Sequence, residues 1–114
     1  MKKVLVTGGG GFIGSQLVEA LLKRNLKVRA LLRYSSTQDC GWLRDVKNKN
    51  LEIFYGDISD YDSVCEAVKG VHIIFNLAAL ISVPYSFKNP ESFIKVNVTG
   101  LMNILRAYNQ NKNL

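Results

Sequence analysis

Five of the seven residues after Thr7 are glycines, and this segment has the residue types and spacing best suited to ligand binding. Residues 7–14 follow the short apolar run of residues 4–6 and precede a stretch with helical periodicity. In a strand–turn–helix of this kind, the helix begins with free N–H groups, and a backbone without side chains lets a pyrophosphate approach them. The segment therefore predicts a dinucleotide-binding loop. The alternative is a tight turn between strand and helix that binds nothing.

The glycines of this loop are expected to differ in their tolerance of side chains. A Cβ atom at Gly8, Gly11 or Gly14 is expected to obstruct the turn, the approaching pyrophosphate or the packing of the helix on the strand. Gly9 and Gly10 are expected to be freer to vary.

The spacing Gly-x-x-Gly-x-x-Gly behind Thr7, with Phe and Ile before the last glycine, resembles the extended short-chain dehydrogenase/reductase family, the NAD-dependent epimerases and dehydratases. The resemblance runs through all 114 residues. It implies a Rossmann-type fold that binds NAD or NADP. The loop residues that it implies in cofactor binding are Gly8, Gly11, Phe12, Ile13 and Gly14.

Composition and charge are those of an ordinary soluble domain, with 47% hydrophobic and 21% charged residues. The net charge of +6 is spread along the chain without interleaved aromatics, so no nucleic-acid partner is expected. No apolar run approaches the roughly 20 residues that span a bilayer, so no membrane partner is expected either. Cys40 and Cys65 form no metal-ligand or disulfide pattern, which favours a cytoplasmic location without a bound metal.

Strand and helix patterns alternate along the chain, which is typical of a parallel α/β sheet with helices on both faces. Strands are expected over residues 3–7, 27–32, 51–55 and 71–77, the last of them central and covered on both faces. Helices are expected over residues 12–24, from Ser59 or Asp60 to Gly70, and from Pro90 behind the cap Asn89, with a short one near residues 42–46. Right-handed crossovers and the family resemblance imply the strand order 3-2-1-4.

Apolar residues at helical spacing indicate which faces of the helices pack inward. The first helix is expected to bury Ile13, Leu17, Val18, Leu21 and Leu22. In the last helix, the expected buried stripe consists of Ile94, Val98, Leu101, Leu105 and Tyr108.

Arg33 indicates which cofactor the site prefers. An NAD site usually has an acid about 20 residues after the glycines to bind the ribose 2′-hydroxyl, but this chain has Leu32 and Arg33 there. A guanidinium can bind a 2′-phosphate and stack on adenine. We therefore expect NADP in preference to NAD, the alternative being that Arg33 is merely a solvated strand end.

The resemblance implies further cofactor contacts after the third and fourth strands. An aspartate and the next residue's backbone contact the adenine in the family, and the matching positions are Asp57 and Ile58. After the fourth strand, the chain carries Leu77, Ala78 and Ala79, and the small alanines leave room for the cofactor's ribose and pyrophosphate. The alternative for Asp57 is that it is only an aspartate of a strand-to-helix loop. The alternative for Ala78 and Ala79 is that close helix packing alone requires them.

Two asparagines lie at family positions, Asn76 as a departure from the commonest residue and Asn97 as a match. Relatives usually carry His where this chain has Asn76, which keeps a polar side chain there. Asn97 matches an asparagine whose amide supports the active-site backbone and a water. Because an asparagine inside a helix is otherwise unfavourable, a specific partner is expected.

The segments 33–36, 41–43 and 79–86 resemble nucleotide-sugar 4,6-dehydratases, especially those acting on activated N-acetylglucosamine in legionaminic-type acid synthesis. Such enzymes oxidise the sugar at C4 by hydride transfer to the nicotinamide, eliminate water across C5 and C6, and return the hydride. Tyr85 and Ser86 are expected to bind the sugar, unless the segment is only a rigid loop anchor. Alternatives are an epimerase or NADPH-dependent carbonyl reductase of the same family, or a stand-alone dinucleotide-binding or sensing module.

The catalytic residues of this family, a Ser/Thr and a Tyr-x-x-x-Lys pair, are not expected within the chain. Tyr108 and Lys112 match the spacing but follow Asn97 on the same helix, whereas the family has a further strand in between. Residues 1–114 are therefore interpreted as the N-terminal part of a dinucleotide-binding domain, inactive alone. The resemblance implies a homodimer formed through the helix expected over residues 90–108 and the helix after it.

Overall fold

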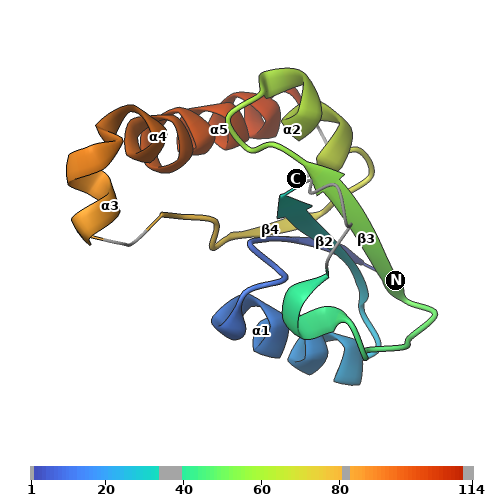
Figure 1. Ribbon diagram of the computed structural model, residues 1–114. Coiled ribbons are helices and arrows are strands. Elements are labelled where there is room, and N and C mark those ends of the chain that lie inside the picture. The colour runs from blue at the N-terminus through green and yellow to red at the C-terminus, as the bar shows by residue number, and fades with distance from the viewer. Residues whose placement is uncertain (1, 34–39, 81–82, 112–114) are drawn as a thin grey trace.

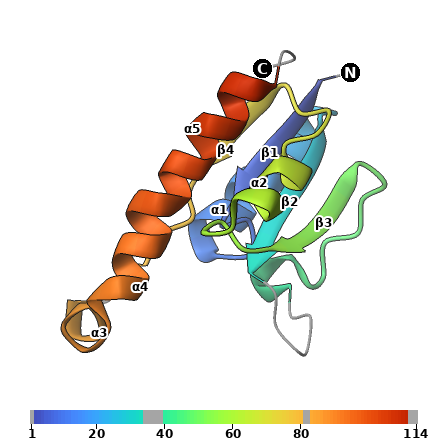
Figure 2. The same ribbon diagram turned by 90° about the horizontal axis from the view of Figure 1, so that it is seen from above.

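The computed structural model describes residues 2–33, 40–80 and 83–111. Its four strands are β1 (Lys3–Thr7), β2 (Lys27–Arg33), β3 (Leu51–Gly56) and β4 (Ile73–Asn76). All pair in parallel, in the order β3-β2-β1-β4, as Figure 2 shows. The sequence prediction of a Rossmann-type sheet is thus confirmed. The order reverses between β1 and β4, which is where such sheets bind their ligands.

Helices cover the two faces of the sheet (Figures 1 and 2). On one face lie α1 (Phe12–Lys23) and the 3₁₀ turn η1 (Gly41–Leu43); on the other lie α2 (Tyr61–Ala67) and α5 (Gly100–Gln110). Alternate strand residues enter the two cores because successive side chains point to opposite faces. Val4 and Val6 pack under α1, whereas Leu5 between them packs under α2 and α5.

One nearly continuous helical tract follows β4 and consists of α3 (Val83–Lys88), α4 (Pro90–Ile94), the π-helical turn η2 (Lys95–Thr99) and α5. The start of α4 agrees with the sequence, since the Asn89 side chain accepts a hydrogen bond from the Ser92 amide and Pro90 is the first helical residue. The helix α3 before it was not predicted, because residues 80–86 were expected to form a loop. Inside α5, the Asn103 amide donates to the Ile58 carbonyl at 3.0 Å. This bond ties the helix to the loop after β3.

The prediction that the apolar stripe of the last helix is buried is wrong. Its members are 44 to 57% exposed, and the face turned to the sheet instead carries Gly100, Asn103, Ile104 and Ala107. Gly100 and Ala107 on this face let α5 approach α2 and the loop after β3; a Cβ on Gly100 would lie 3.0 Å from the Ile58 side chain. Apart from the buried Ile104, the large apolar residues of α5 are left on the outer side.

Other expectations also need correction. Ile13 is 73% exposed, because the first turn of α1 extends past the ends of the strands, whereas Val18 and Leu22 are buried as expected. The β4 strand is shorter than expected and is an edge strand of the described sheet, with Ile73 and Phe75 more than one-third exposed. Residues 42–46 form no helix of their own beyond the single 3₁₀ turn η1.

Some sequence interpretations fall on residues outside the described ranges. These are the 34–39 segment after Arg33, Ile81 and Ser82 in the proposed sugar loop, and Lys112. Among the described residues, no helix is long and apolar enough to cross a membrane.

Candidate dinucleotide-binding site

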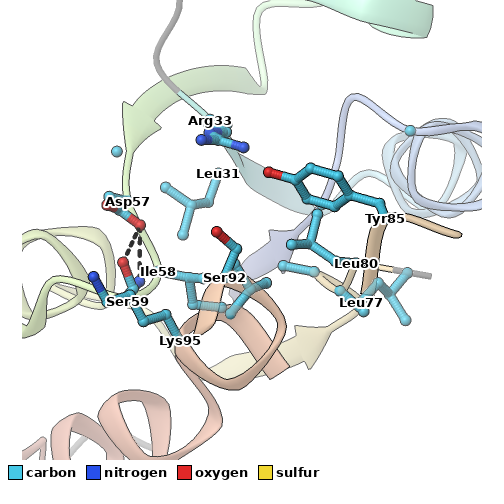
Figure 3. Close-up of a pocket in the computed structure, with 16 residues that line it drawn as sticks. Leu31, Arg33, Asp57, Ile58, Ser59, Leu77, Leu80, Tyr85, Ser92 and Lys95 are labelled. Atoms are coloured by element: carbon cyan, nitrogen blue, oxygen red, sulfur yellow. Dashed lines mark hydrogen bonds between the residues drawn. The ribbon is translucent and has the colours of Figure 1, made fainter. Parts of the chain in front are cut away.

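A cavity of about 480 Å³ opens at the carboxyl ends of the strands. Its walls come from the glycine loop, the ends of β2 and β3, the segment after β4, and the α3–η2 tract (Figure 3). The residues that line it are Gly8, Gly11, Leu31, Arg33, Gly56, Asp57, Ile58, Ser59, Leu77, Ala78, Ala79, Leu80, Tyr85, Ser92, Lys95 and Val96. The cavity is of the size and position expected for a cofactor site.

Within the glycine loop, Gly8 and Gly14 are required by the protein's own packing. Gly8 has φ +68°, which disfavours other residues, and its Cβ would lie 3.1 Å from the Ala78 nitrogen. A Cβ on Gly14 would overlap the Gly8 carbonyl oxygen. Gly11 differs, because its φ of −77° suits any residue and its Cβ would meet only the Gly8 oxygen, at an ordinary 3.4 Å.

Gly9 and Gly10 are not freer to vary, contrary to the sequence expectation. A Cβ on Gly9 would lie 2.8 Å from the Ala30 Cβ, and one on Gly10 would lie 3.0 Å from the Leu32 side chain. The loop folds back on β2, so these two glycines face neighbouring backbone and side chains and not solvent.

Thr7 joins the glycine loop to the wall after β4. Its hydroxyl donates to Asn76 Oδ1 at 2.6 Å and accepts from the amides of Leu77 and Ala78 at 2.9 and 3.0 Å. The side chain is completely buried. This role of Thr7 was not predicted from the sequence, although a hydroxyl residue at the end of a buried strand indicates that a polar partner lies nearby.

Arg33 and Asp57 lie at adjacent strand ends, because Arg33 is in register with Gly56. One carboxylate oxygen of Asp57 accepts from the Ser59 amide at 2.9 Å and from its hydroxyl at 2.7 Å, as the dashed lines in Figure 3 show. This arrangement fixes the loop after β3. In the same view, Arg33 and Tyr85 point toward one another from opposite sides of the cavity.

Asn97 has the specific partner that the sequence predicted. Its Oδ1 accepts from the Leu80 amide at 2.9 Å and its Nδ2 donates to the Leu80 carbonyl at 3.0 Å. The asparagine lies in η2, where the π-helical turn widens the helix, a feature frequent at functional sites. The pair of bonds fixes the cavity wall after β4, although Asn97 itself does not line the cavity.

Most residues predicted from the sequence meet in one place. Nine line the cavity: Gly8, Gly11, Arg33, Asp57, Ile58, Leu77, Ala78, Ala79 and Tyr85. Five do not: Phe12, Ile13, Gly14, Ser86 and Asn97. Seven lining residues were not predicted: Leu31, Gly56, Ser59, Leu80, Ser92, Lys95 and Val96. The i, i+3, i+4 spacing of the last three after Pro90 already indicated one helix face.

A parallel sheet in this order, with a glycine turn and a cavity at its switch point, is the arrangement typical of dinucleotide-binding α/β domains. The family model of GDP-mannose 4,6 dehydratase matches residues 5–114. The chain therefore belongs to this family, within the short-chain epimerases and dehydratases that its glycine spacing resembles.

The chain is also similar to individual proteins, two of them named as UDP-glucose 4-epimerases. The chain is 36% identical over 106 residues to an uncharacterized membrane protein of Methanocaldococcus jannaschii, covering 93% of this chain and 32% of the relative. It is 32% identical over 116 residues to the UDP-glucose 4-epimerase of Rickettsia bellii, covering 97% and 34%. The crystal structure of the Thermus thermophilus UDP-glucose 4-epimerase complex with NAD superposes with a TM-score of 0.79 at 35% identity, covering 95% and 34%. The chain thus spans about a third of the length of these relatives.

Proposed function

We propose that this chain binds NAD or NADP in the cavity beside its glycine loop, as the N-terminal cofactor-binding part of a nucleotide-sugar enzyme. The observation that carries the proposal is Gly11. Packing explains the other glycines of the loop, but at Gly11 the described protein leaves space for a side chain that the sequence does not use. A pyrophosphate lying against the first turn of α1 would need that space.

Substitution of Gly11 by Ala tests this proposal. The backbone accepts alanine, so the cost in unfolding free energy should be at most about 1 kcal/mol, the usual range for a changed helix cap. Affinity for NAD and NADP, measured by calorimetric titration of the intact protein, should fall at least tenfold. A Gly11→Ala variant that binds both dinucleotides as the wild type does would refute the site.

The residues present fit the cofactor. Gly11 leaves the start of α1 open to the diphosphate, and Asp57 keeps one carboxylate oxygen for the adenine amine. The side chains of Ala78 and Ala79 are small, which leaves room for the ribose in this part of the cavity. A nicotinamide dinucleotide bound here would supply hydride acceptance and return.

We propose NADP as the preferred cofactor because the cation Arg33 stands where an NAD site usually carries an acid. Arg33 lines the cavity and is exposed, so its guanidinium is available to a 2′-phosphate. The similar Thermus thermophilus structure is a complex with NAD. The ratio of the affinities of this protein for NADP and NAD therefore decides which cofactor it prefers.

For the reaction, we propose nucleotide-sugar 4,6-dehydration, with Tyr85 contacting the sugar. The description of the matched family supports dehydration, whereas the names of individual relatives favour a second candidate, 4-epimerisation. Mass spectrometry after incubating the intact protein with nucleotide sugars separates them, since dehydration removes one water and epimerisation leaves the mass unchanged. A carbonyl reductase would consume NADPH stoichiometrically, and a sensing module would transform nothing.

The catalytic Ser/Thr and Tyr-x-x-x-Lys are proposed to lie outside these 114 residues, so that the chain alone has no turnover. Measurable turnover by the isolated chain would contradict this.

We also propose that the intact protein is cytoplasmic and that it forms a homodimer. The exposed apolar face of the last helix supports the homodimer. Ser86 does not line the cavity and is retained as a sugar contact only for a substrate that extends beyond it.

A further inference from the structure

The 3₁₀ turn η1, in the connection between β2 and β3, packs directly on the glycine loop. The Trp42 amide donates a hydrogen bond to the Gly10 carbonyl at 3.1 Å. Gly41 has φ +58°, and a Cβ there would overlap the same Gly10 oxygen. Leu43, 2% exposed, anchors the turn in the core under α1. The glycine loop is thus supported by a segment more than thirty residues away in the sequence.

The contact with Gly10 also determines where Gly11 points. The Gly10 carbonyl and the Gly11 N–H belong to one peptide unit, which is planar. Trp42 binds this unit at its oxygen, and the Gly8 carbonyl accepts from its N–H at 3.1 Å. With both ends held, the unit cannot rotate, so the direction of the chain into the first turn of α1 is fixed.

A ring contact holds the other side of Gly11. Phe12, the first residue of α1, and Trp42 meet edge to face with their centroids 5.5 Å apart. The two side chains are 60 and 64% exposed, so burial of apolar surface explains little of why they are there. Trp42 therefore contacts Gly10 through its backbone and Phe12 through its ring, on either side of the helix cap.

We propose that Gly41 and Trp42 are positioning residues that hold the glycine loop in the conformation needed to bind the diphosphate of a dinucleotide. The inference rests on the proposed function, because it assumes that Gly11 and the start of α1 bind this group. It assigns the turn η1 a part in ligand affinity, although Gly41 and Trp42 do not line the cavity. Small displacements of a preorganised binding group have large effects on affinity, which is why such support matters.

Gly41→Ala, compared with Gly70→Ala, tests the proposal in the intact protein. Both glycines have positive φ, +58° and +74°, so both substitutions introduce the same kind of backbone strain. A Cβ on Gly70, however, meets nothing within 4 Å, whereas one on Gly41 displaces Gly10. At a temperature where both variants are folded, Gly41→Ala should weaken NAD and NADP binding at least tenfold and Gly70→Ala less than twofold. Equal effects of the two substitutions would overturn the proposal.

Trp42→Ala and Trp42→Phe give a second test that does not depend on backbone strain. Trp42→Ala should weaken dinucleotide binding several-fold, and Trp42→Phe should restore it because a phenyl edge can still meet Phe12. The fluorescence of Trp42, taken as the difference between wild type and Trp42→Phe, should change when NADP is added. Unaltered affinity in Trp42→Ala together with an unchanged signal would overturn the role of Trp42. A wild-type protein that binds neither dinucleotide would instead refute the proposed function.

Discussion

At the residue scale, Thr7 shows how one buried hydroxyl can organise two segments about seventy residues apart. It is both the last residue of β1 and the partner of three groups at the end of β4. Its position immediately before Gly8 means that the start of the glycine loop and the alanine wall are held by the same side chain. The cavity between them keeps its shape because neither strand end can move without breaking these bonds.

Thr7→Val should therefore be strongly destabilising although its volume hardly changes. The substitution removes three hydrogen bonds of the buried Thr7 hydroxyl, at about 0.5–1.5 kcal/mol each because their partners are only partly buried. Thr7→Ser keeps the hydroxyl and should lose about 1 kcal/mol for the missing methyl group. Urea unfolding of the three proteins measures the difference. Equal stability of the Val and Ser variants would show that the hydroxyl bonds contribute little.

Arg33→Ala should change cofactor selectivity more than overall affinity. Removing the guanidinium eliminates a charge-assisted interaction with a 2′-phosphate but leaves the groups around the pyrophosphate untouched. The ratio of NADP to NAD affinity, measured by titration, should fall about tenfold. Lys88→Ala, which removes a cation that does not line the cavity, is the control and should keep the wild-type ratio. A ratio that does not fall in Arg33→Ala would contradict the assignment.

At the element scale, Arg29 connects β2, β3 and α2. It is 8% exposed, and its Nη1 donates to the carbonyls of Ala67 and Lys69 at 2.6 and 2.9 Å, at the carboxyl-terminal end of α2. A cation there satisfies carbonyls that the helix itself leaves free. Glu52 on β3 lies 3.2 Å from Arg29 Nε and 3.1 Å from Lys3 Nζ, so three strands meet in one charged cluster.

This cluster should make stability sensitive to acid. Burial alone would raise the pKa of Glu52, but Lys3 and Arg29 beside the carboxylate outweigh it and hold the pKa below its usual value. A group with a lowered pKa in the folded state stabilises the protein at pH values above its unfolded pKa of about 4.3, and this contribution is lost as the pH falls through the folded value. Wild type should thus be more stable than Glu52→Gln near neutral pH, and the gap should close in acid.

Urea unfolding across this pH range measures that gap. Glu19→Gln, which alters an exposed carboxylate on α1, is the control and should differ little from wild type at any pH. A gap between wild type and Glu52→Gln that persists below the pKa of Glu52 would contradict the ion-pair explanation.

The sequence was most informative where one local pattern has one physical solution. Alternating strands and helices, the glycine turn and the Asn89 cap all predicted elements that the structure contains. Patterns with two solutions misled the interpretation. A 3.6-residue stripe such as that ending at Tyr108 can serve a core or an outer surface, and periodicity does not distinguish the two. The support of Gly10 by Trp42 could not be predicted either, because it depends on how a connection folds back across the sheet.

At the scale of the whole molecule, the long helical tract presents its larger apolar side chains outward. The exposed residues are Ile94, Val98, Leu101, Met102, Leu105 and Tyr108, all on α4, η2 and α5. Figure 2 shows this tract running along the side of the sheet nearest β4. Monomeric proteins rarely expose contiguous apolar surface of this kind, and where it occurs it commonly marks an interaction site. A second copy of the chain would bury the same stripe on both partners, as two-fold symmetric dimers do.

Leu105→Glu should therefore dissociate the proposed homodimer of the intact protein. A carboxylate placed in an apolar two-fold interface faces its own symmetry mate or is buried without a partner, and either situation costs several kcal/mol. Sedimentation velocity should show wild type as a dimer and Leu105→Glu as a folded monomer with unchanged helical circular dichroism. Phe87→Glu is the matched control, since Phe87 is 83% exposed on α3 but lies off the stripe, and this variant should stay dimeric. If wild type sediments as a monomer, or if Leu105→Glu remains dimeric, the outer face of α5 does not join two copies of this chain.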